Sequence, residues 1–273
     1  ILMLELSLLF MAAGKSSRFG GEPKLLAKIG PSKESLFEIS FQQIIKYINV
    51  NHIHLVVNED NAINIINEVK EVRYKYGLSF EITTSIQEIP QFREKPWGTG
   101  EAAASAWSYI KKPFLLLNSD DLYDEKTFEQ ISKECDITKN YVIGYQLGKT
   151  LKNKKKANRA FIEEKNEQVS ILREKLNIER IYYKDYELDN LYVSVNLFLL
   201  QPPVLMCLLE LSEDFKKEYD LDMTNETLLP DFINSIIKKD QIELHLIKSQ
   251  GDWNGVTFKT DIEEIKKELK KKN

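Results

Sequence analysis

The stretch LFMAAGKSSRFGGEPKLL, Leu9–Leu26, passes from an apolar run directly into a loop rich in glycine, hydroxyl groups and cations. The apolar run 6–12 predicts a buried β-strand. The positions that stand out in the loop are Gly14, Lys15, Ser16, Ser17, Arg18, Gly20, Gly21 and Lys24. A glycine-rich turn after a strand can hold backbone N–H groups against phosphate oxygens, and lysine and arginine add positive charge. The stretch therefore predicts a phosphate-binding loop, although it matches neither GxxxxGK[ST] nor GxGxxG.

Composition limits the class of protein. The chain has 273 residues, of which 42% are hydrophobic and 29% charged, as in soluble globular proteins. A formal net charge of −4 argues against a nucleic-acid binder that relies on bulk positive charge. Cys135 and Cys207 have no CxxC partner, so we expect a reducing, cytoplasmic setting. The sequence leaves open whether the chain forms a homo-oligomer.

No membrane partner is expected. The N-terminal run 1–14 carries Glu5 in its middle and lacks a basic start, so it predicts a buried strand rather than a signal peptide. Elsewhere, no run approaches the roughly 20 apolar residues that span a bilayer.

Strand and helix patterns alternate along the first half of the chain. Strands are expected at 6–12, 53–57, 80–84, 114–118, 141–145, 191–200 and 242–247. Helices are expected at 35–48, 61–76, 99–110, 125–135, 203–217, 225–238 and from Asp261 onward, with Asp261 as N-cap. The segment 149–158 reads as a charged, solvated loop. This order predicts an α/β fold with a mainly parallel, Rossmann-like sheet flanked by helices.

Two unusual segments, 14–24 and 118–124, each follow a predicted strand. Ligands of such sheets bind at the carboxyl ends of the strands. We therefore expect both segments to lie at the same edge of the sheet.

The sequence AAGKSSRFGGEPK resembles the signature of the nucleotidyltransferases of GT-A-type fold, the sugar-1-phosphate nucleotidylyltransferases and their relatives. Ser16 stands where that family often has a second glycine. The resemblance implies catalytic roles for Arg18 and Lys24, which would hold a triphosphate and stabilise the transferring phosphoryl group. It also implies nucleotide contacts by Ala13, Gly14, Lys15, Ser16 and Ser17.

A second matching segment is PWGTGEAAASA, Pro96–Ala106, which resembles the family's G-T-[GA]-x-A segment. The resemblance implies that Gly98 and Thr99 pack on the base and ribose. Trp97 is expected to stack on the base. The structural alternative is a helix start with small residues for close packing.

The segment LLLNSDDLYD resembles the family's strand that ends in a metal-binding aspartate. The resemblance implies Asp120 as the ligand of a Mg²⁺ cofactor, with Asp121 beside it. Adjacent residues near a strand end point in different directions, so Asp120 should dominate. A second ligand is expected in GDWNGVTFKTD, where Asp252 is favoured and Asn254 and Asp261 stay open.

The acceptor site is expected in the second half of the chain. Glu174, in ILREKLNIER, resembles the family's sugar-contacting glutamate, although a quaternary amine is an alternative partner. Asn196, in LYVSVNLFLL, lies on a strand like the one that lines the family's acceptor pocket. A buried amide needs a partner, which can be a ligand or a neighbouring backbone group. The chain would be one domain, with a nucleotide-binding half (1–148) and an acceptor-binding half (149–273).

The resemblance implies an enzyme that transfers a nucleoside monophosphate from an NTP to a phosphorylated acceptor, foremost a sugar 1-phosphate, with release of pyrophosphate. The acceptor phosphate is already an anion, so no side chain must remove a proton from it. Three alternatives stay open: a CDP-alcohol-forming cytidylyltransferase, a GT-A glycosyltransferase and an inactive nucleotide sensor. A glycosyltransferase would be expected to carry D-x-D, whereas this chain has Asp120-Asp121-Leu122.

Replacement of either proposed phosphate-binding cation tests the role of the loop. Arg18→Ala and Lys24→Ala should each lower kcat/KM by at least about 10²–10³, the usual effect of losing one preorganised charge-stabilising group. The measurement is pyrophosphate release, with circular dichroism as the control for folding. Near-wild-type release by both variants would contradict the phosphate-loop prediction.

Overall fold

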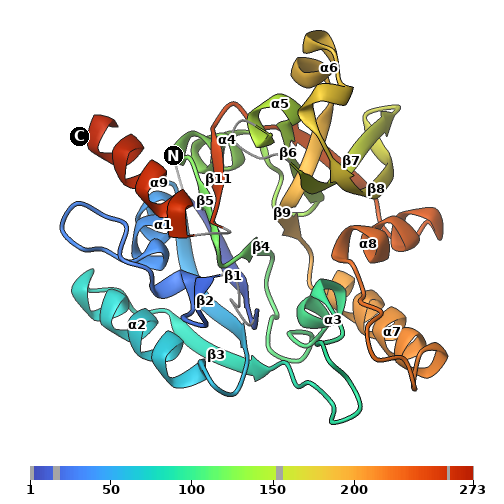
Figure 1. Ribbon diagram of the computed structural model, residues 1–273, viewed down its shortest axis with the longest axis horizontal. Coiled ribbons are helices and arrows are strands. Elements are labelled where there is room, and N and C mark those ends of the chain that lie inside the picture. Colours follow the sequence, from blue (N-terminus) through green and yellow to red (C-terminus); the bar gives the residue numbers. More distant parts are fainter. Residues whose placement is uncertain (1–2, 15–18, 152–155, 257–258, 273) are drawn as a thin grey trace.

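The computed structural model describes residues 3–14, 19–151, 156–256 and 259–272, and its elements are labelled in Figure 1. Across these residues the main sheet runs in the order β10 (Leu244–Lys248), β6 (Asn140–Gln146), β9 (Tyr192–Leu200), β4 (Phe114–Asn118), β1 (Leu4–Ala12), β2 (Ile48–Val57) and β3 (Glu81–Ile86). The β1–β2, β1–β4, β2–β3 and β6–β10 pairs are parallel. The predicted α/β class with a largely parallel sheet is therefore confirmed.

Helices cover both faces of this sheet. Their bounds are α1 (Leu36–Ile45), α2 (Ala62–Lys75), α3 (Thr99–Ala104), α4 (Glu125–Glu134), α5 (Leu147–Thr150), α6 (Asp185–Asn190), α7 (Pro203–Glu218), α8 (Leu229–Lys238) and α9 (Lys259–Lys272). The α1 helix begins at a side-chain cap, because Ser35 Oγ accepts a hydrogen bond from Glu38 N at 2.9 Å. None of the helices in the described residues is long and apolar enough to cross a membrane.

Alternation along β1 explains why both faces are covered. Leu8 and Phe10 pack in one buried cluster with residues of α1, α2 and α4. Leu9, between them, packs in a second cluster with residues of α3, α7 and α8. Figure 1 shows α1 and α2 on one side of the strands and α3, α7 and α8 on the other. A strand buried on both faces needs a continuous apolar run, as this sequence has.

Strand β9 is the exception to the parallel order. It runs antiparallel between β4 and β6. Its pairing with β4 ends at Leu116 and Phe198, and from Ser194 and Val193 it pairs instead with β7 (Ala157–Lys165). The β7 strand forms an antiparallel hairpin with β8 (Gln168–Ile178). The β9 strand thus leaves β4 before β4 ends at Asn118, and the hairpin extends the sheet on that side.

Several sequence predictions need correction. The helix expected at 99–110 ends at Ala104, because i→i+3 bonds such as Trp107 N to Ala104 O replace the helical pattern. Asp261 lies inside the first turn of α9 and is not its N-cap. The segment 149–158 is not all loop, since Lys149 lies in α5 and β7 begins at Ala157.

Two loops that are distant in sequence are joined near the start of α3. Thr227 N donates to Trp97 O at 2.6 Å, and Thr227 Oγ1 accepts from Glu101 N at 2.9 Å. In return, Thr99 Oγ1 accepts from Leu229 N, at the start of α8, at 3.0 Å. Each helix start is therefore capped by a residue from the other segment.

The junction leaves no room for a side chain at residue 98. Gly98 has φ +110°, and an added Cβ would lie 2.3 Å from Thr227 O and 2.7 Å from Thr227 N. Gly98→Ala should therefore lower the free energy of unfolding by about 3 kcal/mol or more, since strain and overlap add. Gly77 is the matched control, because it also has positive φ (+62°) but nothing within 4 Å of an added Cβ. Gly77→Ala should cost about 1–2 kcal/mol. Equal losses in urea denaturation would contradict this role of Gly98.

Candidate functional site

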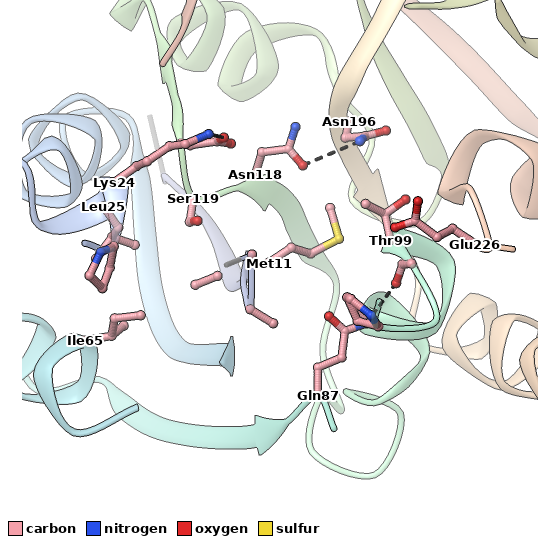
Figure 2. Close-up of a pocket in the computed structure, with 18 of the residues that line it drawn as sticks. Met11, Lys24, Leu25, Ile65, Gln87, Thr99, Asn118, Ser119, Asn196 and Glu226 are labelled. Atoms are coloured by element: carbon pink, nitrogen blue, oxygen red, sulfur yellow. Dashed lines mark hydrogen bonds and ion pairs between the residues drawn. The ribbon is translucent and has the colours of Figure 1, made fainter. Parts of the chain in front are cut away.

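A cavity of about 370 Å³, here called the central pocket, opens at the carboxyl ends of β1 and β4 (Figure 2). Its wall includes the end of β1 with the following loop, the end of β4, the start of α3 and the loop before α8, together with Ile65 of α2, Gln87 after β3 and Asn196 of β9. Met11 and Asn118 are paired in the β1–β4 register, so the two segments that follow these strands lie side by side. The expectation that they share one edge is confirmed.

Seven of the residues expected in the site line the central pocket. These are Ala13, Gly14, Lys24, Gly98, Thr99, Asp120 and Asn196. The predicted nucleotide contacts Lys15, Ser16 and Ser17 and the predicted catalytic Arg18 lie outside the described residues. Figure 2 places Lys24 on one side of the pocket and Thr99 and Glu226 on the other.

A second cavity of about 190 Å³, here called the side pocket, adjoins the central one. The residues that line it are Asn118, Asp120, Asp121, Asn158, Arg159, Glu174, Ser194, Val195, Asn196, Trp253, Gly255 and Val256. Asn118, Asp120 and Asn196 line both pockets. The two cavities therefore meet at these three side chains.

The two neighbouring aspartates have different surroundings. Asp120 Oδ2 accepts from Lys24 Nζ at 2.8 Å, and the Asp120 side chain is 37% exposed. Asp121 is buried, and its Oδ2 accepts from Asn118 Nδ2 at 2.9 Å and from the Tyr123 hydroxyl at 3.2 Å. Asp120 thus faces the meeting point of both pockets, whereas Asp121 is held within the protein and reaches only the side pocket.

Asn196 lies where β9 departs from β4, with φ +63°. A left-handed backbone inside a strand is unusual for a residue other than glycine, although asparagine tolerates it best. Its Nδ2 approaches Asn118 Oδ1 at 3.5 Å, a long hydrogen bond. The amide is therefore turned toward Asn118 at the boundary of the pockets (Figure 2).

Glu174 is a carboxyl group of the side pocket whose pKa is raised. Burial raises its pKa from 4.5 to about 7, and the Asp231 carboxylate adds to the increase, whereas Arg159 opposes it. Asp231 lies on α8 and accepts from the backbone N–H of Glu174. Near neutral pH both the protonated and the ionised forms of the Glu174 carboxyl are therefore populated.

Trp97 is not placed as a base-stacking platform. Its side chain is only 6% exposed, and it does not line the central pocket. The Arg93 guanidinium carbon lies 3.6 Å from the ring centroid, and Phe215 packs edge-on. Arg93 in turn donates to Asp222 O at 2.6 Å and to Asn225 O at 2.5 Å. The Trp97 ring thus helps to hold the loop before α8, and the stacking expectation is wrong in this conformation.

Asp252 also lies away from the expected place. The short strand β11 (Trp253–Gly255) pairs antiparallel with β5 (Asp121–Tyr123), so Gly255 is opposite Asp121. Asp252 falls beyond the end of that ladder, where its carbonyl accepts from Asp124 N and its carboxylate lies 3.5 Å from Lys149 Nζ. It lines a different surface cleft and neither of the two pockets. This register separates Asp252 from Asp120.

The described residues provide only part of a metal site. Among them, no group of three or more His, Cys, Asp or Glu side chains could hold a metal ion. Mg²⁺ commonly takes one or two carboxylates, with water and substrate oxygens in its other positions. Asp120 and Asp121 at the side pocket fit that smaller requirement.

Sequence reasoning missed several lining residues. Gln87, Ser119, Glu226 and Leu228 line the central pocket, and Asn158 and Arg159 line the side pocket. Asn118 and Ser119 directly precede the aspartate pair, so their positions were the available signal. Arg159 lies three positions after the lysine run 154–156, and nothing in the local sequence distinguishes it from those lysines.

No protein-family model matches the chain, and no curated protein is similar to it in sequence. Solved structures share its fold over nearly all of its length. An inositol-1-phosphate CTP transferase from T. maritima has a TM-score of 0.67 at 11% identity, with 99% of this chain and 98% of the other covered. A UDP-glucose pyrophosphorylase complexed with UDP-glucose has a TM-score of 0.67 at 17% identity, with 99% and 100% covered. A UTP-bound UGPase from Acinetobacter baumannii has a TM-score of 0.63 at 12% identity, with 99% and 95% covered. At these identities the likeness shows the fold, and it confirms the fold that the N-terminal signature predicted.

The pKa of Glu174 predicts a pH dependence of stability. Because the folded chain binds this proton more tightly than the unfolded chain, stability should fall as pH rises from about 4.5 to about 7, by at most about 3 kcal/mol. Glu174→Gln should remove this loss. Burial lowers the pKa of His54 to about 3, which gives the opposite slope in both proteins and cancels in the comparison. Urea denaturation at pH 5 and pH 7.5 measures the difference, and equal pH slopes would contradict the burial of an ionisable Glu174.

Proposed function

We propose that this chain is a nucleotidyltransferase that moves a nucleoside monophosphate from an NTP to a phosphorylated small-molecule acceptor, foremost a sugar 1-phosphate, and releases pyrophosphate. The observation that carries the proposal is the meeting of two cavities at Asp120, with Lys24 at hydrogen-bond distance from its carboxylate. A group-transfer enzyme needs two substrate sites that share one reacting centre. Two solved structures of similar fold are an inositol-1-phosphate CTP transferase and a UDP-glucose pyrophosphorylase, and this supports the proposal of a nucleotidyltransferase.

The central pocket is suited to the nucleotide. Lys24 lies on the side where the phosphates would be held, and Thr99, at the start of α3, lies across from it (Figure 2). Gln87 Nε2 donates to Gly98 O at 2.9 Å and to Glu101 Oε2 at 2.7 Å. Both amide hydrogens are therefore occupied, and the Gln87 carbonyl oxygen is the part that can accept a hydrogen bond from a base. The nucleotide half is not confined to 1–148, because Glu226 and Leu228 also line this pocket.

The side pocket is suited to the acceptor. Its lining is mostly polar, and Glu174 and Asn196 both belong to it. The acceptor phosphate would lie at the end where Asp120 and Asn118 join the two pockets. From there an acceptor phosphate oxygen reaches the α-phosphorus of the NTP.

The chemistry is a substitution at phosphorus. An oxygen of the acceptor phosphate forms a bond to the α-phosphorus, and the bond from that phosphorus to the bridging oxygen of pyrophosphate breaks. Lys24 neutralises charge on the phosphates. When the substrates bind, the Asp120 carboxylate gives up its contact with Lys24 and turns toward them. Bound Mg²⁺, held by Asp120 with Asp121 nearby, would offset the negative charge of several phosphate oxygens.

The test is pyrophosphate release with each of the four common NTPs, combined with sugar 1-phosphates and phosphorylated alcohols, in Mg²⁺ or in EDTA. We expect release only with an NTP, an acceptor and Mg²⁺ together. Asp120→Asn should lower kcat/KM by about 10²–10³, and Asp121→Asn should lower it less. Asp214→Asn is a matched control, because Asp214 is exposed on α7 and pairs with Lys217.

The alternatives give different results in the same assay. Release only with CTP and a phosphorylated alcohol would identify the cytidylyltransferase. NTP binding without release under any condition would favour a nucleotide sensor. Sugar transfer from an NDP-sugar without pyrophosphate would favour a glycosyltransferase. A larger loss in Asp121→Asn than in Asp120→Asn would move the metal role to Asp121.

A further inference from the structure

The wall of the central pocket that faces Lys24 carries a carboxylate to which the proposed reaction gives no role. Glu226 lies in the loop before α8, lines the central pocket, and its side chain is 38% exposed. Its Oε2 accepts from Lys95 Nζ at 3.3 Å, and the Lys95 side chain is 52% exposed. A carboxylate offers about four acceptor positions, so Glu226 keeps acceptor capacity for a ligand.

Arg93 fixes the backbone on both sides of this ion pair. Its Nε donates to Lys95 O at 3.1 Å, and its Nη2 donates to Asn225 O, directly before Glu226, at 2.5 Å. Its Nη1 bonds a further carbonyl of the same loop at 2.6 Å. Arg93 is buried, and its guanidinium lies on the Trp97 ring. One planar group therefore ties the loop that carries Glu226 to the segment that leads into α3.

Charge decides which part of a nucleotide can approach Glu226. A carboxylate repels the triphosphate, whereas Lys24, on the other side of the pocket, attracts it. The ligand group at Glu226 must therefore donate hydrogen bonds. In a nucleotide these donors are the hydroxyl groups of the sugar and the N–H groups of the base.

The order of the side chains along this wall selects the sugar. Figure 2 shows Glu226 between Gln87 and Asn196. In the proposed binding mode, the base lies at Gln87 and the α-phosphate lies at Asp120, where the two pockets meet. The sugar joins the base to the α-phosphate, so it passes the wall at Glu226. Its two adjacent hydroxyl groups can both donate to one carboxylate.

We propose that the Glu226 carboxylate accepts hydrogen bonds from the ribose hydroxyl groups of the nucleotide, and that Arg93 is the positioning residue that holds Glu226 there. Glu226 thereby makes the site selective for ribonucleoside over deoxyribonucleoside triphosphates. The inference rests on the proposed function for the direction in which the nucleotide lies. It adds to that function the class of nucleotide that is used.

The experiment measures nucleotide binding by calorimetry, in Mg²⁺ and without an acceptor, so that no transfer takes place. The probes are ATP, CTP, GTP and UTP, followed by the 2′-deoxy and 3′-deoxy forms of the one that binds most tightly. The variants are Glu226→Ala and Arg93→Lys. The second variant keeps the charge and removes the planar set of donors.

Each variant has a matched control. Glu129 is 37% exposed, pairs with Lys133 on α4 and lines neither pocket, so Glu129→Ala controls for the loss of a paired carboxylate. Arg73 donates to Phe80 O at 2.9 Å, and its guanidinium carbon lies 5.9 Å from the centroid of the Phe80 ring. Arg73→Lys therefore controls for the loss of an arginine that is bonded to the backbone.

In wild type and both controls, at least one deoxy form should bind about 10–100-fold more weakly than its parent, the usual effect of losing a hydrogen bond to a charged group. In Glu226→Ala and in Arg93→Lys this ratio should fall to about 3 or less. A ratio of two dissociation constants compares two ligands on the same folded protein. A loss of stability alone therefore leaves the ratio unchanged.

Other outcomes overturn the inference. These are equal binding of both deoxy forms by the wild type, an unchanged ratio in either variant, or no binding of any of the four NTPs. A changed preference among the four bases with an unchanged deoxy ratio would assign Glu226 to the base instead.

The proposed function is judged separately, by pyrophosphate release. If the expected ratios are found but no pyrophosphate is ever released with an acceptor, the inference stands and the proposed function fails. If pyrophosphate is released and the deoxy forms bind equally well, the proposed function stands and the inference fails. If Arg93→Lys does not fold, Glu226→Ala decides by the same ratio.

Discussion

The site depends on the departure of strand β9 from strand β4. Pairing between them holds through Leu116 and Phe198, and then β9 turns to β7. Asn196 occupies this turn with a left-handed backbone, and Asn118 bridges the opening by donating to Val195 O at 3.2 Å and to Asp121. If β9 stayed paired with β4 to its end, the two cavities would not meet at Asp120. The turn of the backbone at Asn196 thus separates β9 from β4 and lets the two cavities meet, as a transfer between two bound substrates requires.

Charge is distributed unevenly on either side of that centre. Lys24 lines the central pocket beside Asp120, and Arg159 lines the side pocket together with Asp121 and Glu174. We propose that the phosphates of both substrates gather around Lys24 and Asp120, and that the remainder of the acceptor enters the side pocket. The reciprocal caps at Thr99 and Thr227 fix the far wall of the central pocket, and Arg93 holds the loop that carries Glu226.

The sequence was sufficient to predict those parts of the fold that are set by interactions within a few residues. The apolar run of β1 and the loop after it predicted a doubly covered strand and a ligand edge, because both are set by burial and backbone geometry over a few residues. The sequence also predicted Lys24, Gly98 and Asp120 on the nucleotide side of the site, and these three residues line one cavity. Asn196, expected in the acceptor part, lines both cavities. The β7–β8 hairpin was missed because charged residues cover its outer face and hide the period of two. Asp252 was misplaced because the register of β11 on β5 depends on pairing across more than 100 residues of sequence. Trp97 was misread because an aromatic residue before a glycine gives no sign that Arg93 will cover it.

The central claim is that nucleotide and acceptor occupy two adjoining pockets and react at Asp120. It is tested most directly by a crystal structure of the protein with Mg²⁺, an acceptor phosphate and the α,β-methylene analogue of whichever NTP stabilises it most against heat. We expect the base between Gln87 and Thr99, the α-phosphate beside Asp120, and the acceptor phosphate within about 3.5 Å of the α-phosphorus. Nucleotide density in the side pocket, or an α-phosphate that contacts neither Lys24 nor the Asp120 region, would show that the two cavities do not form the proposed site.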